Sequence, residues 1–280
     1  MRRRYVSENS TSYRENGTDI RFRWKSGSVT GFLSNDDLTI GQYKITNQTF
    51  VEITKADGDE LMKSQADGVV GLGYPLDCSR AVTPVFDLMT KQRDSLRRAF
   101  SFYFSKDDPD SSELWLGGIS PYHFRGPFTY VPVTKKFYWQ FKMDSIEMNN
   151  ADETTFCAQG CQAILDSGEV YIRGPPIDVQ ALNEAIGARE SSEGVYEVVC
   201  KEMKNMPNIT MTIAKRGFWL SPEDYILVLT EGRITSCFST FASSNKPYWT
   251  LGQPFMRKYF TVFDRAQNIV GFAEAKGRYE

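Results

Sequence analysis

The feature that most limits the fold of this chain is its long succession of short apolar segments, separated by Gly, Asn, Asp and Pro. Segments of this length and spacing are typical of β-strands joined by tight turns. We expect strands at residues 20–24, 29–40, 66–73, 99–104, 113–119, 128–133, 138–148, 162–166, 195–200, 208–214, 218–229 and 258–275. Apolar residues at helical spacing occur at 84–100 and 178–188. The pattern predicts an all-β protein, and two similar apolar-Gly turns, VVGLGYP and WTLGQPF, favour two related lobes.

The bulk composition favours a folded core and argues against a nucleic-acid partner. The chain has 280 residues, of which 41% are hydrophobic, enough for one large domain or two lobes. Its net charge is −2, from 33 basic and 35 acidic residues that are well mixed. No run of roughly 18 apolar residues predicts a membrane-spanning helix, and no apolar signal-peptide region follows the initial MRRR.

A single histidine, His123, limits the chemistry that the chain can support. A histidine-rich metal site is not supported, and a Ser-His-Asp or Cys-His triad would depend on this one residue. We therefore expect no metal and no cofactor.

Cysteines and glycosylation sequons favour a secretory history. The five cysteines are Cys78, Cys157, Cys161, Cys200 and Cys237, and the sequons begin at Asn9, Asn16, Asn47 and Asn208. The CAQGC pair could close a disulfide loop, or it could join Cys200 and Cys237 around zinc, although compact two-by-two spacing is lacking. Cys78 is left over, either as a free thiol or with a partner outside this chain.

The stretch AILDSGEVYIRGP, residues 163–175, places Asp166 directly after an apolar run. Burial of a carboxylate beside a core strand is costly unless the charge is paired or used. The residues alone allow two interpretations, a catalytic carboxylate or a simple Asx turn at the end of a strand.

Several long segments, taken together, resemble one family. They are ADGVVGLGYP, TPVFD, SFYFS, ELWLGGISPYHFRGPFTYVPV, YWQFKMDSIEM, CAQGCQAILDSG, PNITMTI and WTLGQPFMRKYFTVFDRAQNIVGFAEA. Their order is similar to that in pepsin-like aspartic proteases of the pepsin and cathepsin D group, over Tyr5 to Ala275. The resemblance implies a bilobal all-β fold. Residues 1–127 would form a partial N-terminal lobe with a flap hairpin, and 128–280 a C-terminal lobe with the D-S-G turn.

The resemblance also implies that Asp166 is one of two catalytic aspartates, each carried by a D-[ST]-G turn. Asp166-Ser167-Gly168 matches the second of these turns, and the triplet occurs only once in the sequence. The start, MRRRYVSENSTSY, resembles the stretch that follows the first catalytic loop in relatives. We therefore expect the N-terminal lobe to be truncated and to lack the first catalytic Asp.

The flap and the catalytic loop both depart from the family pattern. The segment 22–34 aligns with the flap, with Trp24 at the usual Tyr and Lys25 at the usual first Gly. Glu169 stands where Thr or Ser is usual; it would either disturb the water network of the site or turn to solvent. Gln253 stands where Asp is common. The residues expected to line the substrate cleft are Trp24, Lys25, Ser26, Gly27, Ser167, Gly168, Glu169 and Thr250.

By the same resemblance, Cys157 pairs with Cys161 and Cys200 with Cys237, in a monomeric protein that is secreted or lysosomal/vacuolar. The function implied is that of an aspartic endopeptidase lineage, acting on polypeptides but with little or no activity as the chain stands. The alternative is a pseudoprotease that binds peptides or protein partners without cleaving them. A third hypothesis is a homodimer in which two copies of Asp166 meet.

Overall fold

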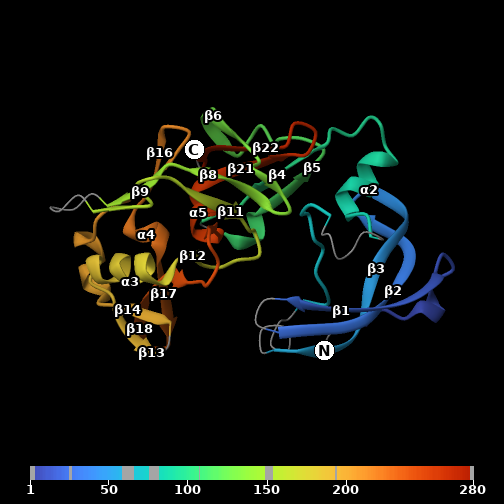
Figure 1. The fold of residues 1–280 in the computed structure, drawn as a ribbon, viewed down its shortest axis with the longest axis horizontal. Coiled ribbons are helices and arrows are strands. Elements are labelled where there is room, and N and C mark those ends of the chain that lie inside the picture. Colours follow the sequence, from blue (N-terminus) through green and yellow to red (C-terminus); the bar gives the residue numbers. More distant parts are fainter. Residues whose placement is uncertain are drawn as a thin grey trace. The chain divides into compact units, whose positions relative to one another are not determined.

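The computed structural model describes residues 4–24, 27–58, 66–75, 82–106, 108–148, 154–192 and 194–277. Most of these residues lie in strands, and this confirms the expected all-β class (Figure 1). The chain divides into two compact units, Met1–Arg97 and Arg98–Glu280.

The first unit is built on a three-stranded antiparallel sheet of long strands. Its strands are β1 (Arg14–Trp24), β2 (Gly27–Ile40) and β3 (Tyr43–Asp57), accompanied by η1 (Ser7–Asn9) and α2 (Val85–Lys91). A Cβ atom at Gly27 would lie 1.8 Å from the carbonyl oxygen of Asp57. Glycine is therefore required at the start of β2, where the strand lies close to β3.

In the second unit, a six-stranded sheet carries the segment with Asp166 at its centre. Its order is β19-β12-β20-β11-β8-β7. The bounds are β7 (Lys135–Lys136), β8 (Trp139–Met143), β11 (Cys161–Leu165), β12 (Ile172–Gly174), β19 (Phe241–Ser243) and β20 (Trp249–Leu251). Strand β11 runs parallel to β20 and antiparallel to β8. Ala163, Ile164 and Leu165 are all buried, so β11 holds the backbone that precedes Asp166 in a fixed position.

Further sheets and helices complete the described part of the second unit (Figure 1). The five-stranded sheet contains β4 (Ala99–Tyr103), β5 (Glu113–Leu116), β6 (Phe124–Pro132), β21 (Tyr259–Asp264) and β22 (Ile269–Ala275). One four-stranded sheet contains β9 (Ser145–Met148), β10 (Thr155–Phe156), β15 (Ile209–Ile213) and β16 (Arg216–Leu220). The other contains β13 (Arg189–Ser192), β14 (Val195–Val198), β17 (Ile226–Glu231) and β18 (Ile234–Ser239). The helices are α3 (Pro176–Ala185), α4 (Pro222–Tyr225) and α5 (Gln253–Lys258); η3 (Pro109–Ser111) and η4 (Cys200–Asn205) are short 3-10 turns.

Aromatic side chains fill the core of the second unit. Phe100 stacks on Phe263 with ring centroids 4.9 Å apart, and the edge of Trp139 meets Phe263 at 5.1 Å. These contacts join β4, β21 and β8, strands of two different sheets. Edge-to-face and offset pairs of this kind are favourable beyond the area that they bury.

Some expected elements differ from the structure. The strand at 66–73 is wrong: residues 66–75 form no strand, and no described strand pairs with them. The strand at 43–57 was not expected, and a strand at 218–229 is wrong in part because α4 interrupts it. The helix at 84–100 ends at Lys91, since Ala99 and Phe100 pair with β21 instead.

The expected lobe boundary between residues 127 and 128 stays a prediction. The compact units divide between Arg97 and Arg98. Strands β4 and β5, which precede residue 127, share a sheet with β21 and β22 near the end of the chain.

Candidate active site

Asp166 lies at the end of β11, where the strand turns away from the sheet. Its N–H donates to the carbonyl oxygen of Leu251 on β20 at 3.3 Å. Its Oδ1 accepts a 2.9 Å hydrogen bond from the N–H of Gly168, and its carbonyl oxygen accepts from the N–H of Glu169 at 3.1 Å. Asp166 is exposed, although the three preceding residues are buried. The buried strand therefore presents one carboxylate at the surface in a defined turn.

The turn at Asp166 rests closely on the start of α5. The N–H of Gln253 donates to the carbonyl oxygen of Glu169 at 2.8 Å, and the Gln253 amide Nε2 donates to the carbonyl of Ser167 at 3.4 Å. A Cβ at Gly252 would lie 2.3 Å from the carbonyl oxygens of Glu169 and Tyr171. Because Gly252 has no side chain, its backbone can approach the backbone of residues 169–171 more closely than any other residue type would allow.

Glu169 does not turn to solvent, which was one of the two alternatives expected from the sequence. Its side chain is only 14% exposed, and Oε2 lies 2.8 Å from Nε of Arg173 in an ion pair. Its Oε1 accepts from the N–H of Tyr171 at 3.2 Å. The guanidinium of Arg173 also lies over the ring of Tyr171, 4.9 Å from its centroid. The negative charge of Glu169 is therefore balanced within the loop.

The other residues expected to line a cleft have different surroundings. Gly168 is exposed and Ser167 is half-buried. Thr250 is buried in β20, where it pairs with Ile164 and Arg173. In the first unit Trp24 pairs with Gly27 across the end of the β1–β2 hairpin; Lys25 and Ser26 lie outside the described residues. Their role in binding substrate stays a prediction.

Two tyrosines near Asp166 were not recognised from the sequence. Tyr138 precedes β8, Tyr248 precedes β20, and their ring centroids lie 5.9 Å apart. Burial, followed by the neighbouring Tyr138 and the negative charge of Asp166, raises the pKa of Tyr248 to about 12. The available signal was a Tyr-Trp pair at the start of both the YWQ and the YWTLG segments, but such aromatic residues also suit a core strand.

The expected disulfides are present. Cys157 is bonded to Cys161, with Cα atoms 5.7 Å apart, and Cys200 to Cys237, with Cα atoms 5.4 Å apart. These bonds exclude the zinc hypothesis, since all four sulfurs are paired. The first bond closes the loop that leads into β11, and Cys78 lies outside the described residues.

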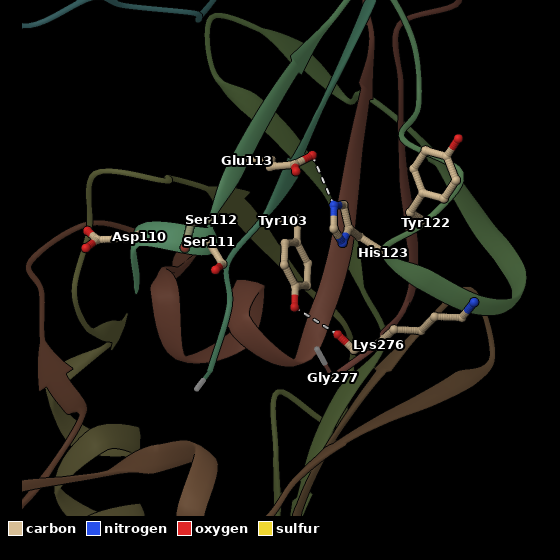
Figure 2. Close-up of a pocket in the computed structure, with 9 residues that line it drawn as sticks. All are labelled: Tyr103, Asp110, Ser111, Ser112, Glu113, Tyr122, His123, Lys276 and Gly277. Atoms are coloured by element: carbon tan, nitrogen blue, oxygen red, sulfur yellow. Dashed lines mark hydrogen bonds and ion pairs between the residues drawn. The ribbon is translucent and has the colours of Figure 1, made fainter. Parts of the chain in front are cut away.

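His123 belongs to a separate polar pocket of about 400 Å³ in the second unit (Figure 2). Its Nε2 lies 3.0 Å from Oε2 of Glu113, and its ring stacks on Tyr103 with centroids 4.1 Å apart. The lining residues are Tyr103, Asp110, Ser111, Ser112, Glu113, Tyr122, His123, Lys276 and Gly277. Asp166 is not one of them, so His123 is a paired residue of a different site.

The remaining surface features concern glycans, metals and membranes. Asn9, Asn16, Asn47 and Asn208 are all exposed. Among the described residues, no group of three or more His, Cys, Asp or Glu side chains is placed to hold a metal ion. No helix in the same part of the chain is long and apolar enough to cross a membrane.

Comparison with known proteins gives one consistent result. A family model for eukaryotic aspartyl protease matches residues 1–275. Cathepsin D of Chionodraco hamatus is 39% identical over 99% of this chain and 71% of its own length. Cathepsin D of Homo sapiens is 38% identical over 97% of this chain and 70% of its own length. Cathepsin E of Mus musculus is 39% identical over 95% of this chain and 68% of its own length.

Proposed function

Because the chain belongs to the eukaryotic aspartyl protease family, we propose that Asp166 is one of two carboxylates with which an endopeptidase of this lineage cleaves polypeptides. The observation that carries the proposal is the turn at Asp166, which presents an exposed carboxylate at the end of a buried central strand. The all-β structure agrees with the pepsin-like fold of the family.

The chemistry needs a base and an acid at the same bond. One carboxylate takes a proton from water, and a protonated partner donates to the carbonyl oxygen of the substrate. Aspartic proteases are the standard example of two carboxyl groups that share one proton, because two like charges so close cannot both form easily. The Gly168 N–H, which donates to Oδ1 of Asp166, holds that carboxyl in a defined orientation.

The second carboxylate is not supplied by another D-[ST]-G triplet, since the 280 residues contain only one. We therefore propose that this polypeptide alone has little or no peptidase activity. Val69 (68%) and Val70 (58%) are exposed, although their segment resembles one found in the family.

The test joins this chain to an upstream segment that carries a D-T-G turn and measures proteolysis at acid pH. We expect cleavage that a statine-type inhibitor blocks, whereas the 280-residue polypeptide is inactive. Continued inactivity of the correctly folded, extended protein would refute the endopeptidase proposal.

A second candidate is a pseudoprotease that retains peptide binding without turnover. It is favoured by the single D-[ST]-G triplet and by Glu169, which places an Arg-bound carboxylate at a position where Thr or Ser is usual in the family. Calorimetric binding of a peptide inhibitor to the extended protein, without cleavage of any peptide in a diverse library, would select this candidate.

We also propose that the protein is a monomer, that it is glycosylated, and that it is secreted or lysosomal/vacuolar. The exposed sequons and the two disulfides support an oxidising compartment. Light scattering measures the molar mass in solution, and a monomeric mass would exclude the homodimer in which two copies of Asp166 meet. Treatment with an endoglycosidase tests the second point.

A further inference from the structure

Glu169 makes four polar contacts that join separate parts of the candidate site. Its N–H donates to the carbonyl of Asp166, and its carbonyl accepts from the N–H of Gln253. Its two carboxylate oxygens accept from the N–H of Tyr171 and from Nε of Arg173. One residue therefore connects the Asp166 turn to the start of α5 and to β12.

Arg173 is itself held from three directions. Besides Glu169, its NH1 donates to the carbonyl of Ser243 on β19 at 3.4 Å, and its guanidinium lies over the ring of Tyr171. The Arg173 backbone pairs with Thr250 in the central sheet. The Arg173 guanidinium is thus held in one place by the sheet, and the Glu169 carboxylate binds to it there.

The loop has little room to adjust if this attachment is lost. The carbonyl oxygens of Glu169 and Tyr171 lie against Gly252, where even a methyl group would approach to 2.3 Å. A charge-assisted hydrogen bond in partly buried surroundings is stronger than a neutral one, and loss of one partner leaves the other unpaired. The Glu169–Arg173 ion pair has the geometry to decide the conformation of residues 166–171.

We propose that Glu169 is a positioning residue: its ion pair with Arg173 sets the direction in which Asp166 presents its carboxylate. The inference rests on the proposed catalytic role of Asp166. It assigns a purpose to a residue that replaces the hydroxyl usual in the family.

The test uses the Gly168 amide as a reporter, because this N–H donates directly to Oδ1 of Asp166. We expect E169Q and R173Q to move the Gly168 signal in a ¹⁵N NMR spectrum and to speed its hydrogen exchange about tenfold. The double variant E169Q/R173Q should add little to either single change, since both remove the same interaction. R173K, which keeps the cation, should restore part of the protection.

The matched control is R125Q, which removes an ion pair of similar length, 2.9 Å, between Arg125 and Glu274 in the five-stranded sheet. It should leave the Gly168 signal and its exchange unchanged. If E169Q, R173Q and R173K lower the melting temperature but leave the Gly168 amide as in the parent, Glu169 is only structural and the proposal is wrong.

This readout is independent of proteolysis. Failure of the extended protein to cleave peptides would refute the proposed function while leaving the amide result intact. In an active extended protein, E169Q should lower kcat with little change in KM, because the substitution leaves unchanged the Glu169 backbone that is expected to line the substrate cleft.

Discussion

Two groups of charged side chains in the second unit are held in different ways. The side chain of Asp224, in α4, is 1% exposed and accepts hydrogen bonds from Nζ of Lys258 at 2.8 Å and from Nζ of Lys106. It also accepts from the N–H and hydroxyl of Ser221, so it caps the helix. The Glu169–Arg173 pair lies nearer the surface and contacts a loop.

The two groups differ in burial: the charge of Asp224 stabilises the fold, whereas the Glu169–Arg173 pair lies where it can position the candidate site. Burial alone would raise the pKa of Asp224, but hydrogen bonds from Lys106 and Lys258 outweigh it, and the pKa lies below its ordinary value. Nζ of Lys258 also lies 2.9 Å from the centroid of the Trp219 ring. The side chains of Asp224 and Lys258 are enclosed, whereas the pair at Glu169 holds a segment that contains an exposed carboxylate.

The largest effect is expected at Asp224. D224N leaves Lys258 buried without its counter-ion, so we expect the free energy of unfolding to fall by about 3–5 kcal/mol. Urea denaturation measures the loss, and E223Q, which changes the exposed neighbouring acid, serves as the control. A fall below about 1 kcal/mol would mean that the buried cluster does not stabilise the fold.

Gly252 offers the next largest effect, because it connects the Asp166 loop to the sheet. G252A places a methyl group 2.3 Å from two carbonyl oxygens, and we expect a loss of about 1–3 kcal/mol together with a shifted Gly168 amide signal. G118A, where the nearest atom to an added Cβ lies 3.5 Å away, is the matched control. Equal stability of the two variants would contradict the close approach at Gly252.

The pH dependence of stability sharpens the comparison further. Asp224 has a lower pKa in the folded state than its ordinary value of 3.8, so its stabilising contribution is complete above that value. The contribution is lost as the pH falls below 3.8 through the folded pKa. Denaturation between pH 5 and pH 2, chosen as roughly spanning this window, should show a smaller acid loss in D224N than in the parent. If the stabilities of D224N and the parent fell in parallel with pH, Asp224 would not contribute to the loss of stability in acid.

The smallest expected effect on stability is at Arg173. R173Q breaks an ion pair that is partly exposed, so we expect a loss of about 1 kcal/mol, well below that of D224N. The same urea series measures it. A loss of stability as large as that of D224N would mean that the Glu169–Arg173 pair stabilises the fold as strongly as the Asp224 ion pairs do.

The sequence was informative where the interacting residues belong to one continuous motif. The Asp166 turn and the Cys157–Cys161 loop involve residues a few positions apart, and both were predicted. The strand at 43–57 was missed because its polar residues Thr46, Asn47 and Gln48 interrupt the apolar pattern, although pairing with β2 stabilises it. Tertiary pairing decides such segments more than their own composition does.

The environment of the candidate site depended on contacts that spacing does not reveal. The sequence showed that Glu169 adds a carboxylate next to Asp166. Its partner Arg173 is recognised only in the structure, where β12 places the guanidinium beside it. Likewise, nothing in the order of residues indicates that Tyr248 lies within the electrostatic influence of Asp166. The strand expected at 66–73 does not form, and no strand of the described residues pairs with that segment.

The central claim is that Asp166 is one half of a catalytic pair, and acid proteolysis by matched proteins tests it most directly. We predict no cleavage by the purified 280-residue polypeptide, cleavage once a segment with a second D-T-G turn is joined to it, and complete loss of that cleavage in D166N. Cleavage by the 280-residue polypeptide alone that disappears in D166N, or cleavage by the extended protein that survives D166N, would contradict the account.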